Sequence, residues 1–276
     1  MRLHIEHETI FSYSQPVREA IGEARLRPRD DAGQRLLGFR LALDPHVPVA
    51  PLGDRFGNTI HCYSVLAPHR RLTITATSEV ETSADALIAA PALSPLEQHS
   101  FTAISQYVPF TDDLLAFARA AAPADADAAT TANALSSAIY ASCAYESGST
   151  DISTTADAVL AGRRGVCQDF AHLLIALCRG LGLPARYVSG YLYDSDMPAD
   201  AILASHAWAE VFLEGRGWLG IDPTHNRATG SLYTRVALGR DYADAAPVRG
   251  IYQGETKETL EVRVRMRAAE QTPITS

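Results

Sequence analysis

The sequence predicts an α+β fold in which a small all-β, sandwich-like domain precedes a larger domain of helices and antiparallel strands. Residues 1–85 contain short stretches where apolar and polar residues alternate, which is typical of half-buried strands. Residues 165–178 have the 3.6-residue apolar period of a helix, and residues 205–223 form two alternating runs around a turn. A chain of 276 residues is long enough to bury a separate core in each domain.

The first domain is expected to consist of strands joined by tight turns. Alternating residues occupy 3–7, 39–43 and 72–80, and residues with turn propensity occupy 44–45 and 53–54. Short strands at this spacing, without helical periodicity, favour a compact sandwich or barrel. The scattered histidines and the cysteine of this region lack the spacing of metal ligands, so no metal site is expected there.

A passage rich in alanine, proline and serine, residues 83–95, is expected to link this domain to a core of residues 96–255. Helices are predicted for residues 112–121, with Thr111 as the N-cap, and for residues 130–144.

The segment 165–178 carries the candidate nucleophile. Apolar residues recur at i, i+3, i+4 and i+7 from Ala171 to Cys178, which predicts one buried helical stripe, and Cys167 lies in the first turn. The unpaired N–H groups and the positive end of the helix dipole favour a thiolate, the nucleophilic form of cysteine. The alternative is a buried, unreactive cysteine, because free cysteine is among the most buried residue types.

A general base and its orienting carboxylate are predicted from two alternating runs, residues 205–213 and 217–223, joined by a turn centred on Glu214. Strands paired about this turn place His206 opposite Asp222, or nearly so, with both side chains on one face of the sheet. A carboxylate beside an imidazole fixes its tautomer and stabilises its charged form. This is the role of the third member of a catalytic triad.

Other titratable residues close to these positions are expected to be structural. His225 follows in a loop and lacks a hairpin partner, so His206 is preferred as the base. The negative charge of Asp169 opposes thiolate formation, so a structural role is expected for it. It is expected to accept hydrogen bonds at the helix N-terminus or to pair with Arg186. His172 is expected to be packed or hydrogen-bonded inside the core.

The motifs around the three candidate residues resemble those of a known family. Gly-Val-Cys ahead of an apolar helix, His-Ala-Trp and Asp-Pro-Thr resemble the core of the transglutaminase-like superfamily of papain-fold cysteine enzymes. The first domain, with the run 54–58, resembles the β domain that precedes this core in a bacterial branch. The resemblance implies a papain-like core, a triad of Cys167, His206 and Asp222, and acyl transfer through a thioester. It also implies an oxyanion hole in which an upstream side chain joins the N–H of Cys167, with Tyr145 as the candidate.

Four functions are compatible with these residues. The expected one is hydrolysis of a peptide or protein amide by a cysteine peptidase or amidase, and the second is transfer of the same acyl group to an amine, as in a transglutaminase. No residue separates these acceptors, and water is preferred because it is always present. A zinc site of Cys167, His206 and Asp222 is disfavoured by the ligand spacing, and a non-catalytic binding module is disfavoured by the complete triad. No cofactor or metal is predicted.

Composition limits the expected partners and location. The chain is 47% hydrophobic and 20% charged, as in ordinary soluble proteins, and its net charge of -8 disfavours a nucleic-acid partner. The four cysteines show no disulfide spacing, and the N-terminus lacks the apolar segment of a signal peptide. No apolar run approaches the ~20 residues that span a bilayer. We therefore expect a cytoplasmic protein with a peptide or protein substrate and no membrane contact; the sequence does not determine the oligomeric state.

The C-terminal tail, residues 256–276, is expected to return as a strand to the body of the protein. From Leu260 to Met266, apolar residues alternate with charged ones, which is a half-buried strand pattern that requires a partner. The pattern leaves open whether that partner lies in the core sheet or in the first domain. Residues 236–247, before the tail, show no regular period and are expected to be irregular.

Overall fold

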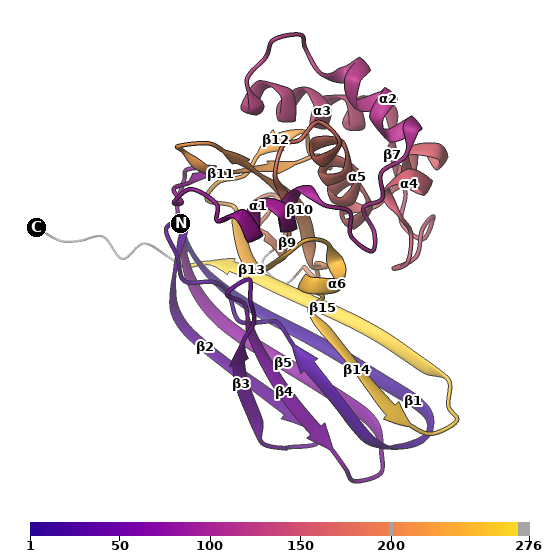
Figure 1. The fold of residues 1–276 in the computed structure, drawn as a ribbon. Helices are drawn as coiled ribbons and strands as arrows, with labels where there is room; N and C mark the ends of the chain where they lie inside the picture. The colour runs from indigo at the N-terminus through magenta and orange to yellow at the C-terminus, as the bar shows by residue number, and fades with distance from the viewer. Residues whose placement is uncertain (199–200, 270–276) are drawn as a thin grey trace, which may run out of the picture.

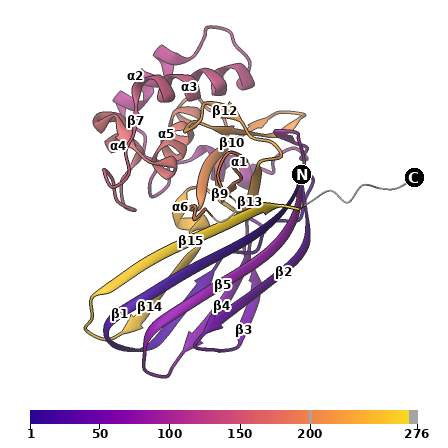
Figure 2. The ribbon, with the colours of Figure 1, turned by 180° about the vertical axis from the view of Figure 1, so that it is seen from behind.

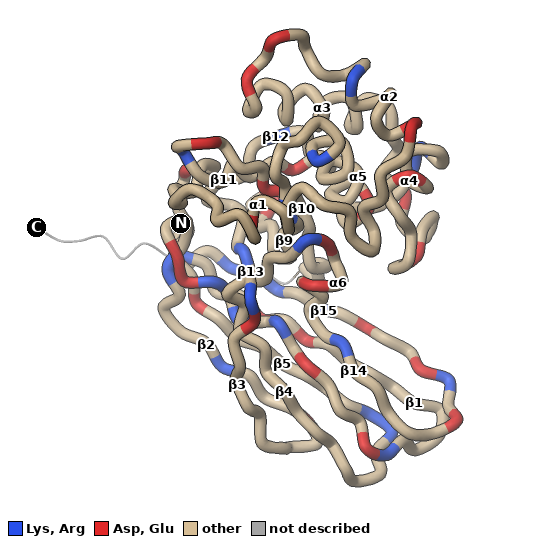
Figure 3. Tube along the Cα trace, viewed as in Figure 1, with Lys and Arg blue, Asp and Glu red and all other residues tan. Residues whose placement is uncertain are grey.

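The computed structural model describes residues 1–198 and 201–269, and in it a β domain lies against a mixed core of helices and strands (Figure 1). The view from behind shows the helices gathered at one end of the molecule and the long strands at the other (Figure 2). Acidic and basic residues are interspersed along both parts (Figure 3). Among the described residues, no helix has the length and apolar character needed to cross a membrane. The α+β class predicted from the sequence is confirmed.

The β domain is a sheet folded into two layers about one long strand. Its strands are β1 (Arg2–Ala24), β2 (Gln34–Asp44), β3 (Val49–Gly53), β4 (Thr59–Val65), β5 (His69–Thr82), β14 (Val248–Gln253) and β15 (Glu258–Ala268). The first half of β1 pairs with β5 and β15, and its second half pairs with β4 and β14. The pairing with β5 is interrupted between Ser12 and Val17, where β1 passes from one layer to the other. Buried side chains such as Val65 and Leu72 fill the space between the layers.

Both C-terminal strands belong to this sheet. β15 runs antiparallel to β1 from the pair Leu3–Ala268 to the pair Tyr13–Glu258. β14 also pairs with β1, although it lies within residues 96–255, so the expected core boundary at residue 255 falls between two strands of the β domain. Residues 270–276 of the expected C-terminal strand lie outside the described residues.

The core contains a second antiparallel sheet with the order β12-β11-β10-β9-β13, and β6 pairs with β11. The bounds are β6 (Leu87–Ile88), β9 (Ala185–Leu192), β10 (His206–Leu213), β11 (Gly217–Asp222), β12 (Arg227–Ala228) and β13 (Tyr233–Gly239). The expectation that residues 236–247 are irregular is wrong, because β13 and the short helix α6 (Tyr242–Ala245) occupy much of this segment. β13 is buried along its whole length, and a strand buried on both faces has no alternation to reveal it. The expected linker 83–95 supplies β6.

Five helices precede β9 in the chain. They are α1 (Pro95–Thr102), α2 (Asp112–Ala121), α3 (Ala128–Ser142), α4 (Ala156–Gly162) and α5 (Cys167–Gly180), and a short parallel pair, β7 (Ala144–Tyr145) and β8 (Arg164–Gly165), precedes α5. α2 has its predicted bounds, and the Thr111 side chain accepts a hydrogen bond from the N–H of Leu114 at 3.3 Å. α3 begins two residues earlier than predicted, because Asp127 supplies its N-cap.

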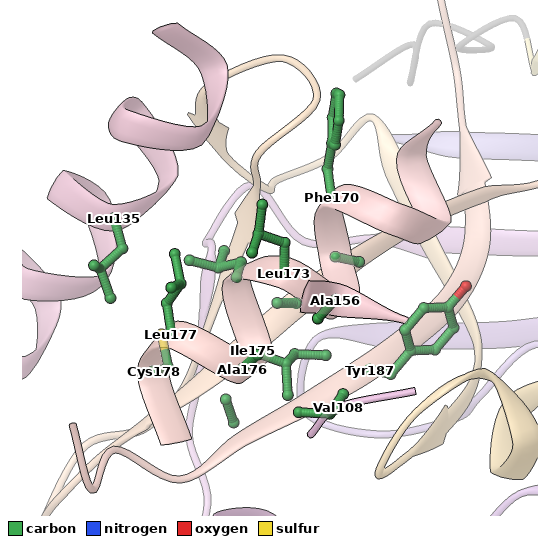
Figure 4. Packing of buried hydrophobic residues seen from close by; sticks show 14 of the residues in the cluster. Val108, Leu135, Ala156, Phe170, Leu173, Ile175, Ala176, Leu177, Cys178 and Tyr187 are labelled. Atoms are coloured by element: carbon green, nitrogen blue, oxygen red, sulfur yellow. The ribbon is translucent and has the colours of Figure 1, made fainter. Parts of the chain in front are cut away.

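Helix α5 is the centre of the core. Its buried side chains run from Asp169 to Arg179 without a gap, rather than along the single stripe that the sequence predicts. Helices cover one side of α5 and strands β9 and β10 cover the other, so residues such as Leu135 and Tyr187 surround its buried side chains (Figure 4). A helix covered on all sides is fixed in position, and this fixes the residue at its N-terminus.

The two domains are joined by apolar packing and by paired polar groups. Side chains of β1, β5 and β15 pack against β9 and β13 in one buried cluster. The Asn58 side chain donates to the carbonyl of Leu238 at 2.7 Å and accepts from its N–H at 2.8 Å. The Tyr191 hydroxyl lies 2.9 Å from Nδ1 of the buried His7. These contacts hold the β domain in a fixed position relative to the sheet that carries the candidate site.

Candidate active site

Cys167 is the first residue of α5, and a close contact determines how the chain reaches it. Gly165 lies so near Asp169 that an added Cβ would sit 2.8 Å from the Asp169 side chain. The Asp169 carboxylate in turn accepts a hydrogen bond from the N–H of Val166 at 2.8 Å. Gly165 is therefore required by close approach, and the Asp169 carboxylate closes the helix N-terminus directly before the half-buried Cys167.

The expected capping role of Asp169 is confirmed, whereas its expected pairing with Arg186 is wrong. The Thr150 hydroxyl also donates to Asp169, at 2.6 Å, while Arg186 pairs with the buried Glu210 at 2.6 Å. Burial raises the pKa of Asp169, against the opposing effect of the hydrogen bonds from Thr150 and Val166. The carboxylate therefore acts as a hydrogen-bond acceptor for two donors at the helix end.

His206 and Asp222 meet as predicted, but through a different register. The hairpin is centred on Gly215, because Leu213 pairs with Gly217, so the pairing is displaced from the predicted one by two residues on one strand. A shift of two preserves the side-chain face, and the two residues become diagonal neighbours. The Nε2 atom of His206 lies 2.8 Å from Oδ2 of Asp222.

Asp222 is fully buried and its carboxylate is saturated with hydrogen bonds. Besides His206, its Oδ2 atom accepts from the Tyr233 hydroxyl at 2.8 Å, and Oδ1 accepts from the N–H of Thr224 at 2.8 Å. Arg227 donates to the Tyr233 hydroxyl at 2.8 Å. Burial favours the neutral acid, but the hydrogen bonds and the positive charge of His206 outweigh it and hold the pKa of Asp222 well below its usual range.

The His206 imidazole lies between Asp222 and Cys167. Burial disfavours the imidazolium and lowers the pKa of His206. Hydrogen bonds with the side chains of Asp222 and Cys167, and the charges of these two side chains, outweigh burial and raise the pKa of His206 to about 9. The ring also lies beside Trp208 and Tyr233 on the same sheet, with centroid distances of 6.1 and 6.2 Å. The arrangement therefore has a thiol, a charged imidazole and a buried carboxylate in sequence, which is the geometry of an activated nucleophile.

His225, which the sequence placed in a loop without a partner, also contacts Asp222. Its Nδ1 atom lies 2.8 Å from the same Asp222 oxygen, but its side chain is 44% exposed, compared with 10% for His206. His206, Asp222 and His225 also present ligand atoms within 4.8 Å of one another, a spacing that a metal ion accepts. The Nε2 atom of His206 and the Nδ1 atom of His225 both contact Oδ2 of Asp222, so a metal bound through these atoms would displace those hydrogen bonds.

The remaining cysteine and histidine of α5 are structural, as expected. Cys178 is fully buried in the core, and burial raises the pKa of its thiol to about 12. His172 is also fully buried: its Nε2 atom accepts from the N–H of Tyr242 at 3.1 Å, and Tyr107 stacks on the ring. Burial lowers the pKa of His172 to about 3, which keeps the ring neutral.

Cys167 and His206 open into a cavity of about 630 Å³ that continues into the β domain. Tyr145, the candidate oxyanion donor, lines the same cavity. Burial and then the charge of Cys167 raise the pKa of Tyr145. Cys167, at the start of α5, and Tyr145 therefore border the same space, as two donors of one oxyanion hole must.

Two family models match separate parts of the chain. The one described as the transglutaminase-like superfamily matches residues 116–223, and the one described as the bacterial transglutaminase-like N-terminal region matches residues 3–81. An uncharacterized protein of Mycobacterium tuberculosis is 37% identical over 291 residues, covering 95% of this chain and 91% of the relative. An uncharacterized protein of Mycobacterium leprae is 32% identical over 287 residues, covering 96% of this chain and 98% of the relative.

A solved structure and a named enzyme extend this picture. A protein of Cytophaga hutchinsonii, described as a candidate cysteine protease, has a TM-score of 0.77 and 26% identity, covering 99% of this chain and 93% of that one. A protein-glutamine gamma-glutamyltransferase of Pseudomonas aeruginosa is 32% identical over 102 residues, which is 33% of this chain and 15% of that protein. The chain therefore belongs to the transglutaminase-like superfamily and carries the N-terminal region of its bacterial branch.

Proposed function

We propose that this protein is a cysteine enzyme that cleaves an amide bond of a peptide or protein through a thioester. The observation that carries the proposal is the ordered contact from the Cys167 thiol to the His206 imidazole and on to the buried Asp222 carboxylate. The three residues come from three elements of the core, α5, β10 and β11, and meet at the N-terminus of a helix that packing holds rigidly. Cys167 and His206 border one cavity, with Asp222 buried behind His206.

In the first half of the reaction, the Cys167 thiolate attacks the amide carbon and forms a C–S bond. The negative charge that develops on the carbonyl oxygen is stabilised by the N–H of Cys167, and the Tyr145 hydroxyl is the second donor. The amide C–N bond then breaks, and the imidazolium of His206 gives its proton to the departing nitrogen. Asp222 keeps the imidazole oriented throughout and stabilises its charged form.

In the second half, neutral His206 takes a proton from water and the resulting oxygen nucleophile attacks the thioester carbon. The C–S bond breaks, the carboxylic acid leaves, and the thiolate–imidazolium pair is restored. If an amine occupies the position of this water, the same steps form a new amide. The match to a gamma-glutamyltransferase over 102 residues supports this transfer reaction as the second candidate.

Mass spectrometry of a glutamine-containing casein digest tests the proposal directly. The enzyme and its Cys167→Ala variant are incubated with the digest, with and without a primary amine. New peptide termini or glutamine converted to glutamate support hydrolysis, and amine adducts support transfer. Products that form equally with the Cys167→Ala variant, or no product in any arm, would contradict a cysteine acyl-transfer enzyme.

A further inference from the structure

The cavity that holds Cys167 continues along strand β15 of the β domain. Its lining includes residues of β1 and β15 that face each other in register: Thr9 with Val262, Phe11 with Leu260, and Tyr13 with Glu258. Side chains two residues apart point to the same face of a strand, so β15 presents a row of side chains to the cavity. The candidate nucleophile and a face of the β domain therefore border one continuous space.

One edge of β15 has unpaired main-chain groups beside this space. The N–H of Val264 donates to Leu203 at 2.9 Å and its carbonyl accepts from the N–H of Leu203 at 2.8 Å, on the edge opposite β1. Main-chain groups also alternate with a period of two, so Val262 and Leu260 point their N–H and C=O groups to that same edge. Within the part of the chain that the structure describes, no strand pairs with the edge at these two residues.

The edge already pairs with another segment where the chain approaches the candidate site, through one isolated bridge at Leu203. Leu203 precedes His206 by three residues, so the segment that pairs with Val264 leads directly to the base. A second strand that continued this pairing past Val262 would begin close to Cys167 and run away from it along β15. It would span about 13 Å between Val262 and Glu258, since a strand rises ~3.4 Å per residue.

The rim of the cavity is apolar and exposed. Leu260 is 54% exposed, and the cross-strand pair Ile21 and Ile251 is 51% and 74% exposed. Ile152 and Tyr145 add two more exposed apolar side chains to the same lining. Large apolar side chains grouped around one opening mark a binding surface, whereas single exposed ones do not.

We propose that the free edge of β15 binds the substrate polypeptide as an added strand, with alternate apolar side chains of the substrate in the cavity. This inference rests on the proposed amide-cleaving function. Unpaired N–H and C=O groups at Leu260 and Val262 match the ladder of an extended peptide, and the apolar lining matches its alternate side chains. A fatty acyl chain would fill the cavity but has no groups to pair with the edge.

Hydrogen exchange of the main-chain N–H groups gives a test with its own internal control. The probe is a nine-residue peptide of alternating valine and serine with a central glutamine, added at saturating concentration to the Cys167→Ala variant. The N–H groups of Leu260 and Val262 should become protected, while those of Glu261 and Arg263, which face β1, should be slow with and without peptide. The same peptide with N-methylated valines should neither bind nor protect.

Two outcomes of this experiment would overturn the proposal. In the first, the N–H groups of Leu260 and Val262 stay unprotected at saturating peptide, whether or not the peptide binds elsewhere. In the second, the N-methylated peptide binds as well as the parent, or dodecanoylglycine binds in its place, which would indicate apolar recognition without a main-chain ladder.

A variant of the active enzyme separates this inference from the proposed chemistry. Val262→Lys places a charge in the apolar lining and should raise KM for the peptide about tenfold or more, because the ammonium must be desolvated. Thr259→Lys, on the exposed opposite face of β15, is the matched control and should leave KM unchanged. Leu260→Lys replaces the first variant if that one does not fold.

The rate at which iodoacetamide labels Cys167 should be the same in all these variants, since this small reagent needs no strand site. Equal KM values for the Val262→Lys, Leu260→Lys and Thr259→Lys enzymes would contradict the strand site while leaving the chemistry intact. A wild-type Cys167 that does not react at all would contradict the proposed function instead.

Discussion

The imidazole of His206 and the carboxylate of Asp222 lie 2.8 Å apart although the two residues are not opposite each other in the hairpin. Extending the observed register places Asp222 beside Trp208, and His206 is its diagonal neighbour on the same face. A diagonal pair reaches this distance because both side chains lean along their strands toward each other. The hydrogen bond, more than the exact register, is what the candidate site requires.

Removing the carboxylate tests this relationship. Asp222→Ala should lower kcat by about 10³- to 10⁴-fold, because the imidazole loses both its orientation and the charge that stabilises its protonated form. The variant also leaves the Tyr233 hydroxyl and the Thr224 N–H without an acceptor, so its fold is checked by circular dichroism before kinetics. A folded variant with wild-type turnover would remove Asp222 from the triad.

The two histidines that share Asp222 should respond differently to substitution. His206→Ala removes the group in contact with Cys167 and should abolish measurable turnover. His225→Ala removes one hydrogen bond at a partly exposed position, worth about 1 kcal/mol, and should change kcat less than about tenfold. Turnover of the two variants in the same amide assay decides between the bases, and the reverse order would assign the base to His225.

The four thiols should differ in reactivity. Cys167 opens into the cavity and contacts His206, whereas Cys178 is fully buried with a pKa raised to about 12. At mildly acidic pH, iodoacetamide should label Cys167 first, ahead of Cys62, Cys143 and Cys178, as read from peptide mass spectrometry over time. First labelling of any other cysteine in the native protein would contradict the nucleophile assignment.

Activity should depend on pH through His206 and should not depend on metal. The pKa of His206 is raised to about 9, above its ordinary 6.5, so the imidazolium persists through neutral pH. Turnover should therefore fall as pH rises through about 9, when this proton is lost before it can reach the departing nitrogen. The profile should be unchanged after dialysis against EDTA. Loss of activity on chelation and its return with zinc would favour the metal set of His206, Asp222 and His225.

Gly165 provides a stability test near the nucleophile. Gly165→Ala places a methyl group 2.8 Å from the Asp169 side chain and must displace the carboxylate that holds the Val166 N–H. We expect about 1–3 kcal/mol of destabilisation from this overpacking, measured by denaturant unfolding. Gly162→Ala, three residues earlier in the chain, is the control, because its added methyl group meets no atom closer than 4.0 Å. An unchanged free energy of unfolding for Gly165→Ala would show that the Asp169 side chain moves aside without cost.

Local patterns in the sequence determined the elements that carry the candidate site. The helical period and the residues around Cys167 predicted a helix with this cysteine at its start, and α5 begins at that residue. Hairpin alternation put His206 and Asp222 on one face, and this survived a register error of two because side-chain direction repeats every two residues. These features depend on residues close together in the chain, which is why the sequence alone reveals them.

Contacts between distant segments decided the rest. β13 escaped prediction because its burial comes from neighbours far away in the chain and leaves no alternating pattern. β14 is mostly exposed, so it shows no alternation either. His225 joined Asp222, and Arg186 joined Glu210 rather than Asp169, because the fold of the sheet sets those distances. The same is true of β15, whose alternation required a partner strand but did not specify β1. The sequence determines which faces must be buried, and only tertiary packing decides which segment covers them.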